Sequence, residues 1–374
     1  MSTYLFILGK DADLSLAELE ARYPKGKIDI IGPDFAILDT NQKINQSEFN
    51  KLGGVIKMGQ VICEADRKKL SDELVRQLTK HHSGSKLNYG ISVYDWSEKN
   101  LRPLLLDLKK ELKKEGIGSR FANQRFRNLS VAQYKGIKNK GVEFLVAKEK
   151  DKFIIAEVIA VQDIDSYSKR DYYKPYRDMK VGMLPPKLAQ IMINLAGDVK
   201  TIWDPFCGGG VLVMEGLLMG HDMIGSDINQ KNLDGAVKNV DWLQREYGFK
   251  NRVDLFIHDA VKPIQNKNFD AVVCEGYLGP PQLRVRSESE LDPVIMELDS
   301  LYMGFFNALK DIAFKGPIVI ALPFFRLKGG KELDLKSTVG KIEKLGFKKN
   351  LKILKYARPD QVVGRAIYYF SVSL

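Results

Sequence analysis

Apolar and polar residues follow different patterns in the two halves of the chain. Up to about residue 165, short apolar runs typical of strands are mixed with segments of helical periodicity, and the clearest of these is 100–115, where leucines recur every three or four positions. This mixture predicts small α+β domains. The predicted strands are 4–8, 35–39, a turn and strand within 52–57, 89–94, 141–148 and 153–161, and the predicted helices are 14–23, 71–81 and 100–115.

From residue 199 to the C-terminal end, strand-like and helix-like segments alternate. Such alternation predicts βαβ units and a mostly parallel, Rossmann-like sheet. Residues 167–186 have little apolar pattern, which predicts a linker, and residues 187–196 then have the pattern of a helix. We therefore predict an α/β fold class in four parts: a ferredoxin-like α+β unit at 1–62, a second α+β domain at 63–165, a linker at 166–186 and a Rossmann-like domain at 187–374.

Basic residues are in excess and are unevenly distributed. The formal net charge is +11, and between Lys99 and Lys150 fourteen Lys and Arg stand against five Asp and Glu, a local net charge of +9. Such a stretch favours an anionic partner, of which nucleic acid is the kind that we expect. The alternative is that the lysines at 109, 110, 113 and 114 form the solvated face of an amphipathic helix.

Cysteine and histidine are few and scattered. The three cysteines and four histidines form no metal-spaced pair, so no structural zinc is expected. Free cysteines fit a reducing compartment. The first ten residues lack the basic start and long apolar core of a signal peptide, and no segment has eighteen uncharged apolar residues. We expect a cytoplasmic monomer with no membrane span.

A glycine-rich loop follows the first strand of the C-terminal domain. The loop, Asp204-Pro-Phe-Cys-Gly-Gly-Gly210, lies between a predicted strand at 199–204 and a predicted helix at 211–220. Glycines at this place let a ligand approach the backbone closely, although an ordinary tight turn is the alternative. The loop has neither the Gly-x-Gly-x-x-Gly spacing of a nicotinamide site nor the Gly-Lys-Ser/Thr of a P-loop.

Acidic residues end the next two predicted strands. Asp227 ends the strand 223–227, 23 residues after Asp204, where a carboxylate can accept hydrogen bonds from ribose hydroxyls. Asp259 follows the strand 253–258, where a carboxylate can accept from an adenine amino group. Either acid alone could be a helix cap or a loop residue. Together, Asp204, Asp227 and Asp259 are acids at the ends of three successive predicted strands, and this arrangement indicates a nucleoside cofactor.

The loop and the two acids resemble the cofactor motifs of class I methyltransferases. Further segments resemble the approach to the catalytic domain in the THUMP-domain-containing tRNA guanine-N2 methyltransferases: 170–175, 184–189 and 194–197. Segments 14–19 and 52–55 resemble the N-terminal region of that family. The resemblance covers nearly the whole chain and is strongest at residues 165–260.

The resemblance implies S-adenosylmethionine as cofactor, tRNA as partner and a THUMP-like domain at 63–165. The implied activity is methyl transfer to the exocyclic N2 amino group of a guanosine, of the position 10 type. The implied cofactor-binding residues are Asp204, Pro205, Phe206, Cys207, Gly208, Gly210, Asp227, Ile228, Asp259, Ala260 and Glu275, and the implied substrate-binding residues are Arg170, Lys174, Tyr277 and Leu278.

The expected catalytic loop departs from the family pattern. A predicted fourth strand, 269–275, leads into Glu275-Gly-Tyr-Leu-Gly-Pro-Pro281, whereas the family has Asp or Asn, two prolines and an aromatic residue. The resemblance makes Glu275 the acceptor of hydrogens from the target amino group and Tyr277 the ring that stacks on the base. Glu is one methylene longer than Asp, and Gly276 stands where a rigid proline is expected. The alternative is an ordinary turn at a strand end.

Two other functions stay open at this point. A DNA adenine or cytosine amino-methyltransferase shares the arrangement of acid, prolines and aromatic residue, although the N-terminal resemblance disfavours it. A catalytically inactive RNA-binding protein on the same fold would fit the altered loop. Methyl transfer from labelled cofactor to tRNA, compared with DNA, separates the three functions.

Overall fold

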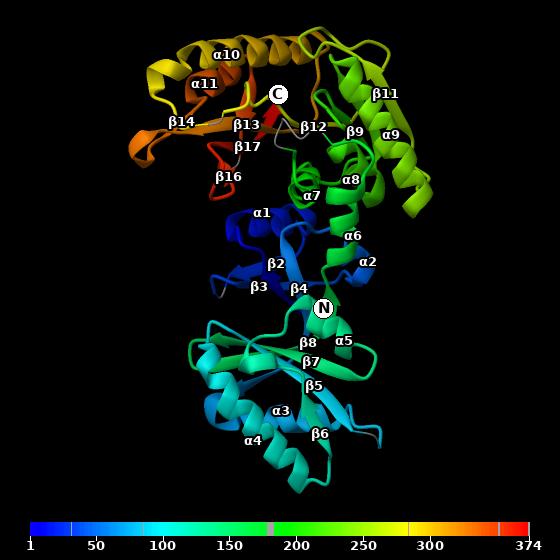
Figure 1. Cartoon of the computed structure of the whole chain (residues 1–374), viewed down its shortest axis with the longest axis vertical. Helices are drawn as coiled ribbons and strands as arrows, with labels where there is room; N and C mark the ends of the chain where they lie inside the picture. The colour runs from blue at the N-terminus through cyan, green and yellow to red at the C-terminus, as the bar shows by residue number, and fades with distance from the viewer. Residues whose placement is uncertain (31, 85, 178–182, 283, 351, 373–374) are drawn as a thin grey trace. The chain divides into compact units, whose positions relative to one another are not determined.

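The computed structural model describes residues 1–30, 32–84, 86–177, 183–282, 284–350 and 352–372, and it divides the chain into two compact units, Met1–Ile164 and Asp165–Leu374. Each unit has its own sheet and its own apolar core. Figure 1 labels the helices and most of the strands of both units.

The first unit is built on one continuous mixed sheet with strand order β2-β3-β1-β4-β8-β7-β5-β6. The predicted boundary at 62–63 falls inside β4, which pairs with β1 and with β8. The division of this unit into two domains stays a prediction. The strands are β1 Ser2–Leu8, β2 Lys27–Ile30, β3 Phe35–Thr40, β4 Val55–Asp66, β5 Leu87–Tyr94, β6 Ser119–Phe121, β7 Gly141–Glu149 and β8 Lys152–Val161.

Helices cover this sheet because each has one apolar face. Helices α3 and α4 lie side by side (Figure 1). The leucines whose spacing predicted α4 are all buried in the apolar core between this helix and the sheet. The lysines of α4 at 109, 110, 113 and 114 are exposed. The helices of this unit are α1 Ala12–Arg22, α2 Gln46–Phe49, α3 Leu70–Thr79, α4 Leu101–Lys114 and α5 Val131–Ile137.

The second unit has the predicted Rossmann-like sheet, so the predicted fold class is confirmed. Its strand order is β11-β10-β9-β12-β13-β17-β15; neighbours are parallel from β11 to β13, and β17 runs antiparallel to β13. The strands are β9 Thr201–Asp204, β10 Asp222–Asp227, β11 Val253–Ile257, β12 Ala271–Glu275, β13 Ile318–Arg326, β14 Glu332–Asp334, β15 Phe347–Lys349, β16 Leu354–Tyr356 and β17 Val363–Val372.

Both faces of this sheet are covered. Figure 1 shows α10 and α11 along one face and α7 and α8 on the other. The parallel strands carry continuous apolar runs, as expected for strands buried on both faces. The helices are α7 Pro186–Leu195, α8 Val211–Met219, α9 Gln230–Tyr247, α10 Glu288–Asp311 and α11 Lys336–Lys344.

The predicted linker begins with helical residues. Helix α6 spans Ile164–Ser168 and continues as a π-helix over Lys169–Tyr173. An ion pair explains this local order, since Arg170 is buried against Glu215 of α8. Residues 178–182 of the predicted linker lie outside the described residues.

Candidate functional site

The glycine loop after β9 turns sharply because two of its residues adopt left-handed backbone conformations. Gly208 has φ 50° and Gly210 has φ 78°, values that glycine adopts without strain. A Cβ at Gly210 would lie 3.1 Å from the Cβ of Ala236 on α9. A Cβ at Gly208 would meet nothing within 4 Å, so the space beside that residue is open. The loop therefore packs against a helix at one residue and offers open space at another.

Asp227 at the end of β10 is joined to this loop. Its Oδ2 accepts a hydrogen bond of 2.9 Å from the Gly208 amide, and its Oδ1 accepts from the Asn229 amide at 2.8 Å and the Asn232 side chain at 3.4 Å. A carboxylate has about four acceptor positions. Asp227 can therefore hold the loop and still accept a hydrogen bond from a ligand.

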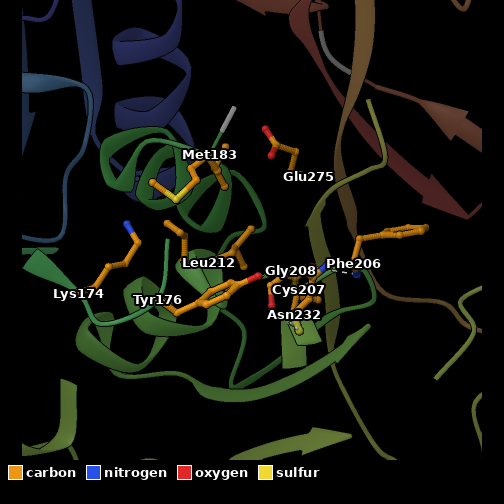
Figure 2. Close-up of a pocket in the computed structure, with 13 residues that line it drawn as sticks. Lys174, Tyr176, Met183, Phe206, Cys207, Gly208, Leu212, Asn232 and Glu275 are labelled. Carbon is orange, nitrogen blue, oxygen red and sulfur yellow. Dashed lines mark hydrogen bonds between the residues drawn. The ribbon is translucent and has the colours of Figure 1, made fainter. Parts of the chain in front are cut away.

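A pocket lies beside the glycine loop, within the second unit (Figure 2). In that view Lys174 lies at the left edge of the group of lining residues and Glu275 at its top. The lining of the pocket thus includes one basic side chain, Lys174, and two acidic ones, Asp204 and Glu275. The residues that line it are Lys174, Tyr176, Met183, Leu184, Asp204, Phe206, Cys207, Gly208, Gly209, Val211, Leu212, Asn232 and Glu275.

The acidic wall of the pocket is desolvated. Burial raises the pKa of Asp204 well above its usual range, and the nearby Asp227 and Glu275 carboxylates raise it further, against the Phe206 amide, which lowers it. Burial likewise raises the pKa of Glu275, although Arg365 opposes this. A wall of buried carboxylates favours a positively charged group in the pocket, because such a group stabilises their ionised form.

Arg365 on β17 holds the carboxylate of Glu275. Its Nε donates to Glu275 Oε1 at 2.5 Å, and the exposed fractions of the two side chains are 2% and 18%. The family pattern gave no indication of this partner. A charge that is largely removed from water is stable only when it is paired. The guanidinium of Arg365 therefore stabilises the ionised carboxylate of Glu275 at the end of β12.

The loop after Glu275 is fixed by Tyr302 of α10. The Tyr302 hydroxyl donates to the Tyr277 carbonyl at 2.6 Å. A Cβ at Gly276 would lie 2.4 Å from that hydroxyl oxygen, which explains why glycine replaces the expected proline. The side chain of Tyr277 is 41% exposed, so its ring is open to a ligand.

The segment that carries Lys174 is clamped onto the domain by Asn239 of α9. The Asn239 side chain accepts from the Tyr176 amide at 2.8 Å and donates to the carbonyls of Tyr176 at 3.0 Å and Gly209 at 2.8 Å. A Cβ at Gly235 would lie 2.2 Å from the Tyr176 ring. We call residues 174–177 the strap, because this segment forms one wall of the pocket.

Several predicted site residues lie together in the pocket, and others do not. Five of the predicted cofactor-binding residues line it, as does Lys174: Asp204, Phe206, Cys207, Gly208 and Glu275. Pro205 is buried and Ala260 packs in the core. Ile228 is exposed, while Asp259 and Leu278 are partly exposed, all outside the pocket lining.

Arg170 is placed differently from the prediction of a substrate contact. The residue is 5% exposed, and its Nε donates to Glu215 Oε1 at 2.6 Å. Lys174 is also buried, with its ammonium donating to the carbonyls of Arg170 at 3.0 Å and Asp171 at 3.1 Å. Arg170 thus serves the packing of this unit, and Lys174 reaches the pocket from the strap.

Sequence reasoning missed the residues that meet the glycine loop from distant positions. Leu184 begins the segment 184–189 whose family resemblance was noted, and Tyr176 and Met183 lie next to such segments, but the resemblance did not indicate that the three residues line a pocket. Arg365 and Tyr302 have no local signal. No helix in the described ranges is long and apolar enough to cross a membrane. Within those same ranges, His, Cys, Asp and Glu form no group of three or more that could hold a metal ion.

Comparison with known proteins identifies the kind of domain that holds this pocket. Residues 174–298 match the UPF0020 family, described as an RMKL-like methyltransferase domain. The chain is 29% identical over 194 residues to a tRNA (guanine(10)-N2)-dimethyltransferase of Methanothermobacter thermautotrophicus, covering 50% of this chain and 51% of that protein. It is 31% identical over 160 residues to the Pyrococcus abyssi protein of the same name, covering 42% and 43%. The chain therefore spans about half the length of the curated relatives it matches.

Solved structures match the fold of the whole chain. TrmN from Thermus thermophilus aligns with a TM-score of 0.54 at 13% identity, covering 99% of this chain and 100% of that one. A possible methylase from Clostridium difficile 630 aligns with a TM-score of 0.53 at 13% identity, covering 100% and 98%. The predicted resemblance is confirmed, and so is the S-adenosylmethionine-dependent methyltransferase fold of the C-terminal unit.

Proposed function

We propose that this protein, which carries an RMKL-like methyltransferase domain at residues 174–298, transfers a methyl group from S-adenosylmethionine to the exocyclic N2 amino group of a guanosine in tRNA. The observation that carries the proposal is the Glu275 carboxylate, which lines the pocket beside the glycine loop and precedes the exposed ring of Tyr277. The names of the relatives support a guanosine at position 10 as the target.

Residues that line the pocket, together with Asp227, Ile228 and Asp259 outside its lining, suit the methyl donor. Gly208 offers open space beside the backbone, and Asp227 retains acceptor capacity for ribose hydroxyls. Asp204 and Glu275 provide a carboxylate wall for the positively charged sulfonium and ammonium groups. Ile228 and Asp259 follow the ends of β10 and β11, where an adenine would lie in this fold.

The chemistry needs an acceptor and a stacking surface. When bound, S-adenosylmethionine supplies the methyl group as an electrophile, and its sulfur retains the bonding electron pair as the nitrogen–carbon bond forms. An exocyclic amino group is a weak nucleophile because its lone pair is delocalised into the ring. Glu275 accepts a hydrogen bond from this group and takes up the proton that it loses, while Tyr277 stacks on the base.

The first unit supplies a basic surface for tRNA. Of the fourteen Lys and Arg between positions 99 and 150, all except Lys148 are exposed, whereas one of the five acids, Glu143, is fully buried. Phosphate contacts made by such residues release counterions. We therefore expect tRNA affinity to fall steeply with salt, and to fall less steeply when the four lysines of α4 at 109, 110, 113 and 114 are replaced by glutamine.

Methylation of tRNA transcripts with labelled cofactor tests the proposal. We expect transfer to a transcript with guanosine at position 10, and none to the same transcript with adenosine there or to duplex DNA. At saturating S-adenosylmethionine, Glu275→Gln should slow single-turnover transfer by about 10²-fold or more, and it should weaken cofactor binding by a smaller factor because Glu275 also lines the pocket. Glu343→Gln is the matched control, because Glu343 is an exposed acid on α11.

Each outcome decides between the candidate functions. Transfer to DNA but not to tRNA would favour an amino-methyltransferase of DNA. Salt-dependent tRNA binding without transfer to any transcript would favour an inactive RNA-binding protein. Wild-type rates in Glu275→Gln would remove Glu275 from the mechanism.

A further inference from the structure

The altered loop from Glu275 to Tyr277 is held by two buried groups that lie far away in the sequence. One is Arg365 on the antiparallel strand β17, and the other is Tyr302 in the middle of α10. Their exposed fractions are 2% and 0%. Neither residue lines the pocket, so both contact the loop outside the pocket lining.

Arg365 fixes one oxygen of the Glu275 carboxylate. The contact joins Arg365 Nε to Oε1 at 2.5 Å, and within the described ranges no hydrogen bond reaches Oε2. A guanidinium is planar and donates in fixed directions, so it constrains a carboxylate more than a lysine ammonium does. Because glutamate is longer than the aspartate expected here, its carboxyl group needs an external constraint to reach one position.

Tyr302 fixes the backbone where the family pattern has proline. Its hydroxyl donates to the Tyr277 carbonyl at 2.6 Å, and its ring lies so close to residue 276 that only glycine fits. Gly276 also donates its amide to the Ala321 carbonyl of β13 at 3.0 Å. A rigid proline is thus replaced by a flexible residue with anchors on two sides.

We propose that Arg365 and Tyr302 are the positioning residues of this loop, the first orienting the Glu275 carboxylate and the second setting the backbone that presents Tyr277. The proposal rests on the proposed function, in which those two residues act on the target base. It accounts for a loop that has lost its proline without losing its defined conformation.

A change in pH response distinguishes positioning by Arg365 from a purely structural role. The charged or titratable groups near Glu275 are Arg365 of β17, Asp204 of β9, Cys274 of β12 and Tyr302 of α10, and Lys174 lies across the pocket. Arg365 is the cation that lowers the pKa of Glu275 against the effect of burial. Its removal raises that pKa, so the ionised carboxylate is lost at a higher pH.

The experiment measures single-turnover methylation of a tRNA transcript against pH for the full chain and its variants. Arg365→Met should move the acidic limb of the rate profile upward by about one unit or more, and Arg365→Lys should restore part of that shift. Tyr302→Phe should lower the plateau rate about tenfold with unchanged cofactor affinity. Tyr368→Phe is the matched control, since Tyr368 is 1% exposed and its hydroxyl has no hydrogen-bond partner in the described residues.

Calorimetry provides a readout that does not need turnover. Because Glu275 lines the pocket, the pH dependence of S-adenosylmethionine affinity should shift in Arg365→Met in the same direction as the rate profile. If wild-type protein methylates no tRNA, the proposed function fails and this calorimetric shift still tests Arg365. If wild-type protein is active but Arg365→Met keeps both pH profiles, or Tyr302→Phe behaves like Tyr368→Phe, the positioning roles are wrong.

Discussion

Arg170 offers a direct test of whether a basic residue near the pocket serves the fold or the RNA. We consider Arg170→Met, which keeps much of the side-chain volume and removes the charge. In the structure Arg170 donates to Glu215 Oε1 at 2.6 Å and Oε2 at 3.2 Å, and to Ser166 at 2.5 Å. Glu215 is fully buried and otherwise accepts from Gln190 at 2.9 Å. Removing one partner of such a pair should cost about 3–5 kcal/mol of folding free energy.

The sign of the pH dependence follows from Glu215. Burial raises its pKa above the usual value, while Arg170 lowers it. A carboxyl with a raised pKa in the folded state holds its proton more tightly there than in the unfolded chain. Stability therefore falls as pH rises from the ordinary glutamate pKa through the folded one. Arg170→Met removes the opposing charge, so this fall should become larger and continue to higher pH.

Urea unfolding followed by tryptophan fluorescence measures the loss. The chain has three tryptophans, and in a Trp96→Phe background the remaining two, Trp203 and Trp242, both lie in the second unit. The double variant Arg170→Met/Glu215→Leu should recover most of the stability, because no buried charge is left unpaired. The tRNA affinity of folded Arg170→Met should match wild type. A stable Arg170→Met protein with weakened tRNA binding would refute this reasoning and restore the substrate contact.

Substitutions at three further residues test the site. Asp227→Ala should weaken S-adenosylmethionine binding by about 1–3 kcal/mol in calorimetry, since ribose hydroxyls lose an acceptor and Gly208 loses its anchor; unchanged affinity would exclude Asp227 from the cofactor site. Tyr277→Ala should cost about 1–3 kcal/mol of stacking in single-turnover assays and Tyr277→Phe clearly less, whereas equal losses would point to the hydroxyl instead. Gly276→Ala should lower the stability of the second unit by about 1–3 kcal/mol and slow transfer, because its Cβ overlaps Tyr302; wild-type melting would show that the loop can move aside.

The sequence predicted those parts of the site that depend on neighbouring residues. The strand, glycine loop and helix around residues 201–219 could be predicted because a buried apolar run, a glycine cluster and another apolar run lie next to one another. The position of Asp227 followed from the same local pattern. These are features in which chain order and spatial order agree.

Contacts between distant residues could not be predicted in the same way. Arg365 and Glu275 are separated by 90 positions and meet only because β17 returns antiparallel beside β13. Arg170 was predicted to bind substrate because its segment, 170–175, resembles the approach to the catalytic domain in the tRNA guanine-N2 methyltransferases, and that resemblance does not indicate whether the side chain is buried. The acidic partner of Arg170 is Glu215, which lies within the apolar sequence of α8. Neighbouring residues do not indicate that Glu215 is buried or which basic residue it pairs with.

The strap formed by residues 174–177 limits where this domain can be joined to a different N-terminal domain by gene recombination. The Asn239 side chain is hydrogen-bonded to both the amide and the carbonyl of Tyr176, and Lys174 lines the pocket beside the glycine loop. A gene fusion that joined a new N-terminal domain at residue 187 would therefore deliver a Rossmann-like core with one side of its pocket missing. A domain with a complete pocket lining begins ahead of Lys174, so a crossover that keeps the whole lining must fall on the N-terminal side of the strap.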